Sequence, residues 1–178
     1  MGMQSIPLRK RCGYRNEKSV VAKAILPGSY DPVTAGHIDI ILRAKDLYGD
    51  VTVGILFNPE KKYIFTPAQK KALLEKALEN TDIPVIIWDG MLYELCEKEG
   101  YTHIVKGVRT GDYEYEEKQA LFNSAHCNAV TVLLPAKKEF EGISSTLVRR
   151  YLAEGKDISQ LCPAAKTAEE YYVENTKM

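Results

Sequence analysis

Pro27-Gly28-Ser29-Tyr30-Asp31-Pro32-Val33-Thr34-Ala35-Gly36-His37 lies between an apolar run, residues 20–26, and a segment with the apolar spacing of a helix. This order predicts a strand, a loop and a helix that Thr34 caps. A capping box would place Glu or Gln at position 37, where this chain has histidine. Free N–H groups at a helix start attract anions, and an imidazole N–H adds to that attraction whereas a carboxylate opposes it. The loop is therefore predicted to bind phosphate, although by itself it also fits a surface turn with His37 as an ordinary polar residue.

A second helix start supports the phosphate interpretation by contrast. Thr66-Pro67-Ala68-Gln69 has an N-cap threonine, proline at the first helical position and glutamine at the third. These choices are typical of a helix start that serves stability alone. The start at Thr34 departs from them at His37, which indicates a ligand there.

Composition limits the class of protein. The chain has 178 residues, 45% of them hydrophobic, and a formal net charge of zero, which predicts a full core and argues against a nucleic-acid partner. No segment has the length of a membrane span and the N-terminus lacks an apolar signal segment, so we expect a cytoplasmic protein without membrane partners. The cysteines form no Cys-x-x-Cys pair and are predicted to be free thiols; they are Cys12, Cys96, Cys127 and Cys162.

Short apolar runs alternate with amphipathic segments from residue 20 onward. The runs predict strands over 20–26, 51–57, 84–88, 103–105 and 130–134. The segments predict helices near 36–48, 67–79, 91–99, 113–125, 145–154 and 164–174. This alternation predicts an α/β fold, a Rossmann-like doubly wound sheet of about five parallel strands with helices on both faces. Residues 20–178 are predicted to form a single domain, and the basic residues 1–19 a flexible extension.

Three further loops at strand ends carry groups that can bind phosphate. Lys61 and Lys62 follow the second strand, Lys106-Gly107-Val108-Arg109 the fourth, and Ser144-Ser145-Thr146 the fifth. Glycine allows close backbone approach, arginine offers a planar fork, and a new helix offers free N–H groups. Each loop also has a structural alternative, solvated lysines in the first and N-capping by Ser144 or Ser145 in the last. Because such loops meet at one sheet edge, together they predict a polyphosphate ligand.

Other polar residues are interpreted as structural. Asp112 and Glu117 stand near a predicted helix start, where the helix dipole favours carboxylates. His103 begins a predicted strand and His126 ends a predicted helix, positions that favour a core or capping role.

Residues 22–165 resemble the nucleotidylyltransferase superfamily, and within it the bacterial phosphopantetheine adenylyltransferases. The resemblance rests on Thr-Ala-Gly-His at 34–37, a form of the Thr-x-Gly-His signature, and on later motifs: Asn-Pro-Glu-Lys-Lys, Lys-Gly-Val-Arg, Asp-Tyr-Glu-Tyr-Glu and Ile-Ser-Ser-Thr. It implies adenylyl transfer from ATP to 4′-phosphopantetheine, giving dephospho-coenzyme A and pyrophosphate in coenzyme A biosynthesis. It also implies Mg²⁺ bound to ATP, with no metal ligand from protein side chains, and a homohexamer.

The resemblance implies roles for particular residues. His37, Lys61 and Arg109 would be catalytic, with His37 stabilising the transition state and the two cations clamping the reactants. Phosphopantetheine would contact Ser29, Lys61, Leu92 and Lys106. ATP would contact Ser29, Tyr30, His37, Gly107, Val108, Arg109, Glu116, Phe140, Ile143, Ser144, Ser145 and Thr146. No protein base is needed, because the attacking phosphate oxygen is already anionic and catalysis consists of alignment and charge stabilisation.

Three departures from the family pattern leave alternatives open. The family usually has arginine where this chain has Lys106, so a bidentate contact becomes a point charge. The segment from Arg109 to Asp112 is one residue short, which affects the placement of Glu116. Ser144-Ser145-Thr146 also resembles the nicotinate mononucleotide adenylyltransferases. The alternatives are transfer to nicotinate or nicotinamide mononucleotide, a nucleotide-binding module without catalysis, and cytidylyl transfer to a small alcohol phosphate.

Overall fold

A five-stranded parallel sheet organises the part of the chain that the computed structural model describes, residues 22–58 and 61–177. The expected extension, residues 1–19, lies outside these described residues. The strand order is β3-β2-β1-β4-β5, and every neighbouring pair is parallel. The strands are β1 Lys23–Gly28, β2 Asp50–Leu56, β3 Val85–Trp88, β4 His103–Val108 and β5 Val130–Pro135. The predicted doubly wound α/β sheet is thus confirmed.

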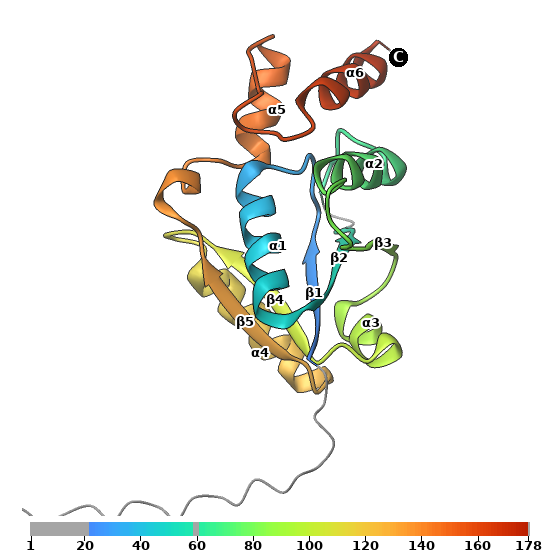
Figure 1. Cartoon of the computed structure of the whole chain (residues 1–178), viewed down its shortest axis with the longest axis vertical. Helices are drawn as coiled ribbons and strands as arrows, with labels where there is room; N and C mark the ends of the chain where they lie inside the picture. The colour runs from blue at the N-terminus through green and yellow to red at the C-terminus, as the bar shows by residue number, and fades with distance from the viewer. Residues whose placement is uncertain (1–21, 59–60, 178) are drawn as a thin grey trace, which may run out of the picture.

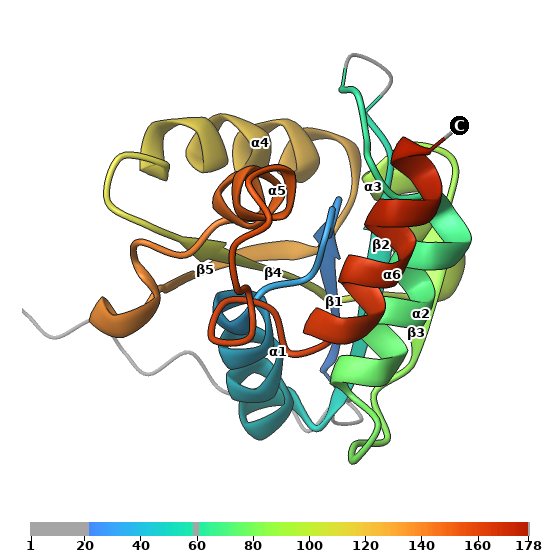
Figure 2. The ribbon, with the colours of Figure 1, turned by 90° about the horizontal axis from the view of Figure 1, so that it is seen from above.

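Helices cover both faces of this sheet. They are α1 Ala35–Tyr48, α2 Pro67–Ala77, α3 Leu92–Glu99, α4 Tyr113–His126, α5 Ser145–Ala153 and α6 Ala165–Thr176, with a short 3₁₀ helix, η1 Lys138–Phe140, before α5. Figure 2 shows α1 and α4 on opposite faces. In Figure 1, α5 and α6 lie beyond the end toward which β1 points, so they stand over the carboxyl edge of the sheet.

The core is divided by the sheet, as the alternation of side chains along β1 requires. Ala24 and Leu26 belong to the larger cluster, which includes buried residues of α1, α2, α5 and α6. Ile25 points to the other face and packs in a smaller cluster with Leu95 and Ile104. This burial fixes β1 at the centre of the molecule.

The winding of the chain reverses between β1 and β4. Their paired residues are Ala24 with His103 and Ile25 with Ile104, so the pairing ends well before the carboxyl ends of both strands. Beyond that point the strands are free to part. Space for a ligand is expected there, at the switch point of the sheet.

One predicted boundary was wrong in a way that affects the site. Lys106, Gly107 and Val108 were expected in a loop after a strand over 103–105, but all three belong to β4 and pair with residues 133–135 of β5. Lysine and glycine have low strand propensity, and pairing with β5 overrides it. The two residues are therefore held on the sheet.

Several smaller expectations can be compared with the structure. Cys96, Cys127 and Cys162 are free thiols, while Cys12 falls in the part that is not described.

His103 Nδ1 lies 2.9 Å from Thr102 Oγ1, at the amino end of β4 and away from the switch point. Across residues 22–58 and 61–177, every helix is too short or too polar to cross a membrane.

Candidate active site

A cavity of about 610 Å³ opens at the carboxyl ends of β1 and β4. Its walls come from residues 26–31, the start of α1, residues 61–63, the carboxyl end of β4, the first turn of α4 and the start of α5. Of the residues predicted from the sequence, those that line it are Ser29, Tyr30, His37, Lys61, Lys106, Gly107, Arg109, Glu116, Phe140, Ile143, Ser144, Ser145 and Thr146. The convergence of separate loops at one sheet edge is therefore observed.

Two predicted residues do not line this cavity. Leu92 is half-buried and packs against the smaller core cluster on the α3 side of the sheet. Val108 is buried at the end of β4. Their contacts with substrate stay predictions.

His37 takes part in the helix start more directly than the sequence indicated. Thr34 Oγ1 accepts a hydrogen bond from the His37 N–H at 3.4 Å, and His37 Nδ1 accepts one from the Thr34 N–H at 3.0 Å. This is a complete capping box with an imidazole in place of Glu or Gln, which corrects the expectation that the two helix starts differ in kind. Because Nδ1 accepts, the ring proton of neutral His37 lies on Nε2.

The surroundings of His37 keep its ring neutral. Burial, together with the smaller effect of the positive charge of Arg109, lowers the pKa of His37 to about 4. The edge of the ring meets Tyr30, with 5.0 Å between the ring centroids. At neutral pH the side chain therefore offers the cavity an uncharged N–H donor of fixed orientation.

Tyr30 lines the cavity and its ring packs against that of His37. Its hydroxyl donates to the Leu26 carbonyl at 3.0 Å, and its backbone adopts a left-handed conformation with φ 45°. A Cβ at Gly28 would lie 2.9 Å from two ring atoms of Tyr30, so only glycine fits there. The phenol proton of Tyr30 is therefore engaged within the protein.

Arg109 is oriented by the residue that begins α4. Arg109 Nε donates to Asp112 Oδ2 at 2.9 Å, and Nη1 donates to the Ile143 carbonyl at 3.5 Å. Asp112 stands at the N-cap but makes no side-chain capping bond. The Asp112 carboxylate, which the sequence pattern assigned to the helix dipole, thus orients the Arg109 side chain at the cavity. These two bonds use Nε and Nη1 of Arg109 and do not involve Nη2.

Lys106 and Glu116 form an ion pair across the cavity wall, 3.3 Å between Nζ and Oε2. The two residues were predicted to bind different substrates, so their pairing joins the two halves of the predicted site. Lys61 and Lys62 stand at the opposite wall, where both are exposed.

The start of α5 is fastened to the loop after β1. Ser144 is the cap, because its Oγ accepts from the Leu147 N–H at 3.1 Å. Ser145 Oγ donates instead to the Pro32 carbonyl at 2.8 Å. The two serines therefore divide capping and docking between them, and the first turn of α5 is aimed at the cavity.

Some lining residues escaped the sequence interpretation. Arg149 lines the cavity and its Nη1 donates to the Asp31 carbonyl at 2.6 Å. It follows Ser145 by four residues, and this spacing on one helix face could have indicated it. Tyr63 also lines the cavity, but its place depends on the fold of the loop and no sequence signal marked it.

Comparison with known proteins gives a family match and several similar relatives. Residues 25–151 match the cytidylyltransferase-like family. The phosphopantetheine adenylyltransferase of Cutibacterium acnes is 39% identical over 145 residues, which are 79% of this chain and 91% of that protein. Those of Alkaliphilus metalliredigens and Thermotoga neapolitana are 38% and 37% identical, over 78% and 77% of this chain and 90% and 87% of their own.

One solved structure supports the fold alone. The crystal structure of the lipopolysaccharide core biosynthesis protein from Thermoplasma volcanium aligns with a TM-score of 0.51 at 19% identity. The alignment covers 66% of this chain and 98% of that one.

Proposed function

The chain belongs to the phosphopantetheine adenylyltransferases of the cytidylyltransferase-like family, and we infer from this membership that it transfers the adenylyl group of ATP to 4′-phosphopantetheine. The products are dephospho-coenzyme A and pyrophosphate, as in coenzyme A biosynthesis. One structural observation supports this most strongly: the switch-point cavity gathers a neutral N–H donor, cationic side chains and a capped helix start. Such groups suit a reaction in which the phosphate of one substrate has to approach the α-phosphate of the other.

His37 is proposed to act on the α-phosphate. Its Nε2–H would donate to an oxygen of that phosphate as negative charge develops in the transition state. The bond from the Thr34 N–H to Nδ1 keeps the proton on Nε2, and the low pKa keeps the ring neutral across the physiological range. The nucleophile is an anionic phosphate oxygen of the acceptor, so no protein group has to remove a proton.

The remaining groups are proposed to align the reactants. Lys61 and Arg109 would clamp the phosphates in line, with Asp112 fixing the direction of Arg109. The N–H groups at the start of α5 would hold the departing pyrophosphate. Phosphopantetheine is proposed to contact Ser29, Lys61, Leu92 and Lys106. ATP is proposed to contact Ser29, Tyr30, Gly107, Val108, Glu116, Phe140, Ile143, Ser144, Ser145 and Thr146.

Mg²⁺ is proposed to arrive with ATP as part of that substrate. The carboxylates that line the cavity each lie beside a cationic side chain; they are Asp31, Asp112 and Glu116. In the described part of the chain, no three His, Cys, Asp or Glu side chains are grouped so that they could hold a metal ion. We propose that phosphate oxygens and water would ligate this Mg²⁺, which would supply charge neutralisation to ATP.

Pyrophosphate release from ATP and phosphopantetheine tests the function. We expect turnover with this acceptor and little with nicotinate or nicotinamide mononucleotide. Lys106 and the short segment before Asp112 are the reasons to measure both acceptors. Activity with a mononucleotide alone would reassign the acceptor, tight ATP binding without turnover would indicate a binding module, and a preference for CTP would indicate cytidylyl transfer.

A single domain over residues 20–178, a cytoplasmic location and a homohexamer are proposed from the same kinship. The length of the match, 91% of the Cutibacterium acnes protein, supports the first of these.

A further inference from the structure

Lys70 of α2 is a fully buried lysine, with 0% of its surface exposed. Within the described residues its ammonium has no hydrogen-bond partner, and the nearest carboxylate oxygen, Asp31 Oδ1, is 3.7 Å away. Burial lowers the pKa of Lys70, while the charge of Asp31 acts in the opposite direction. A buried ammonium without a hydrogen-bond partner costs stability, and the attraction of nearby charges and rings offsets only part of that cost. Its presence therefore indicates a purpose other than stability.

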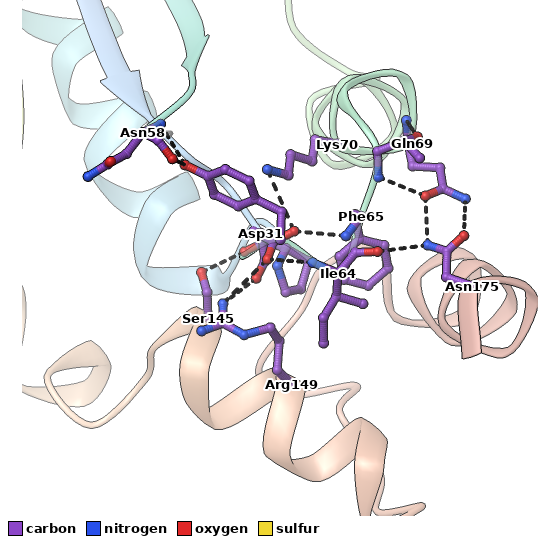
Figure 3. A network of polar contacts seen from close by, with 12 residues as sticks. Asp31, Asn58, Ile64, Phe65, Gln69, Lys70, Ser145, Arg149 and Asn175 are labelled. Atoms are coloured by element: carbon purple, nitrogen blue, oxygen red, sulfur yellow. Dashed lines mark hydrogen bonds and ion pairs between the residues drawn. The ribbon is translucent and has the colours of Figure 1, made fainter. Parts of the chain in front are cut away.

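Asp31, the partner of Lys70, joins three segments of the site. Its two carboxylate oxygens accept from the Ile64 N–H at 3.1 Å and the Phe65 N–H at 3.0 Å. Arg149 approaches the same carboxylate from α5, 3.7 Å from Oδ2. Figure 3 shows Lys70 and Arg149 reaching this carboxylate from different helices. The loop after β1, the segment before α2 and the start of α5 are thus held at one point.

The other neighbour of Lys70 is the loop that carries Lys61. Lys70 Nζ lies 3.3 Å from the centroid of the Tyr63 ring and 5.1 Å from that of Phe57, both within the range of cation–π attraction. The Tyr63 hydroxyl accepts from the Asn58 N–H at 2.8 Å. Tyr63 is therefore tied to the end of β2 through Asn58, and Lys70 lies against the Tyr63 ring.

We propose that Lys70 is a positioning residue for Lys61: it holds Asp31 on one side and the Tyr63 ring on the other, and so sets where the loop presents Lys61 to the cavity. The inference rests on the proposed role of Lys61 in the reaction. Lys70 is not among the described residues that line the cavity, so the role we propose for it is indirect.

Lys70→Met is the direct test, because methionine has a similar length and no charge. Lys70→Met removes one partner of a buried pair, but Asp31 keeps the Ile64 and Phe65 N–H groups and Arg149, so we expect only a modest fall in Tm. Loss of alignment is expected to lower kcat by about 10- to 100-fold. A residue with only a structural role would lower the Tm and leave the kcat of the folded protein unchanged. Lys70→Arg, which keeps the charge, is expected to restore part of the loss.

Lys71→Met is the matched control on the same helix. The Lys71 side chain is 41% exposed and pairs only with Glu75, 3.7 Å away on the outer surface. We expect its kcat and Tm to match those of the unchanged protein.

A double-mutant cycle with Lys61→Ala distinguishes the inference from the proposed function. If Lys70 acts through Lys61, Lys61→Ala with Lys70→Met is as slow as Lys61→Ala alone. Unchanged kcat in Lys70→Met, or losses that multiply in the double variant, would overturn the inference while the role of Lys61 stands. Unchanged kcat in Lys61→Ala would remove the proposed role and the inference with it.

Tyr63→Phe repeats the cycle without disturbing the buried charges. It keeps the ring over Lys70 and removes the hydroxyl that accepts from Asn58. We expect a lower kcat, again without further loss in the Lys61→Ala background. A kcat equal to that of the unchanged protein would count against the inference even if Lys70→Met failed to fold.

Discussion

The two ring nitrogens of His37 have different tasks. Nδ1 completes the capping box of α1, as the side chain of Gln69 does for α2. Nε2 is left for the cavity. Because a carboxamide can do the first task, substitution can separate the stability of the helix start from the chemistry of the site.

His37→Gln is predicted to keep the fold and lose the reaction. Glutamine rebuilds the box on the pattern of Gln69, so the free energy of unfolding at pH 7 is expected to stay close to that of the unchanged protein. Turnover is expected to fall by about two to three orders of magnitude, since the directed Nε2–H is lost. Pyrophosphate release and urea unfolding give the two numbers.

Gln69→Ala is the control for this substitution. It breaks the box of α2 and removes the bonds of Gln69 with Asn175, which keeps its bond to the Ile64 carbonyl, so a loss of about 1 kcal/mol of stability is expected while turnover persists. Near-normal turnover in His37→Gln would exclude His37 from the mechanism.

The low pKa of His37 predicts that acid destabilises the protein. The unfolded chain binds a proton at this residue below about pH 6.5, whereas the native protein does so only near pH 4. The contribution of His37 to stability is therefore complete above pH 6.5 and falls as the pH drops through this window, by up to about 3 kcal/mol. Urea unfolding at pH 7 and pH 5 measures it. The unchanged protein is expected to lose more stability than His37→Gln, and equal losses would contradict the assignment.

At the scale of elements, one contact sets α1 against β4. A Cβ at Gly107 would lie 2.8 Å from Cγ1 of Ile40, a buried residue one turn after His37. The absence of a side chain at 107 therefore lets α1 approach the strand. This approach brings the helix that carries His37 to the strand that leads to Arg109.

Gly107→Ala is predicted to push α1 from β4. The overpacking is expected to cost about 1–3 kcal/mol of unfolding free energy. Ile40→Ala makes room, so the double variant is expected to be more stable than the sum of the two single losses implies. Gly142→Ala is the control, since a Cβ at Gly142 meets nothing within 4 Å and its unfolding free energy should not change. Strict additivity in the cycle would show that this contact does not set the spacing.

The order of elements could be predicted because it depends on local periodicity, and the cavity because strand ends in a parallel sheet share one edge. What failed depends on pairing between distant segments. Lys106 and Gly107 are in a strand only because β5 lies beside them. Lys70 has the local pattern of a solvated helix lysine, and its burial against Asp31 and Tyr63 follows from packing that no local pattern encodes.

On the scale of the whole molecule, the last helix supports the first loop. Asn175 of α6 donates to the Ile64 carbonyl at 2.9 Å and to Gln69 Oε1 at 2.8 Å, as Figure 3 shows. Ile64 in turn donates to Asp31. The site is therefore braced from the carboxyl-terminal end of the chain, although its signature residues stand near the beginning.

The face formed by α4 and the start of β5 lacks such support. A helix on a sheet usually buries an apolar stripe, yet the buried residue of α4 is Asn123. Leu121 and Val130 are 65% and 58% exposed there, and β5 is an edge strand of the sheet. An exposed apolar edge of this kind is expected to be covered by another copy of the chain in the proposed homohexamer.

Leu121→Lys is predicted to dissociate that assembly. Six copies of the unchanged 20.0 kDa chain are expected to sediment as one hexamer. In Leu121→Lys, an unpaired charge would be buried at each contact between copies, so the hexamer is expected to dissociate into smaller species. Leu47 of α1 is 64% exposed and lies on the other side of the sheet, so Leu47→Lys is a control of equal exposure. Sedimentation velocity at several concentrations measures both variants. If Leu121→Lys keeps the mass of the unchanged protein, or if Leu47→Lys dissociates it equally, the α4–β5 face is not the contact between copies.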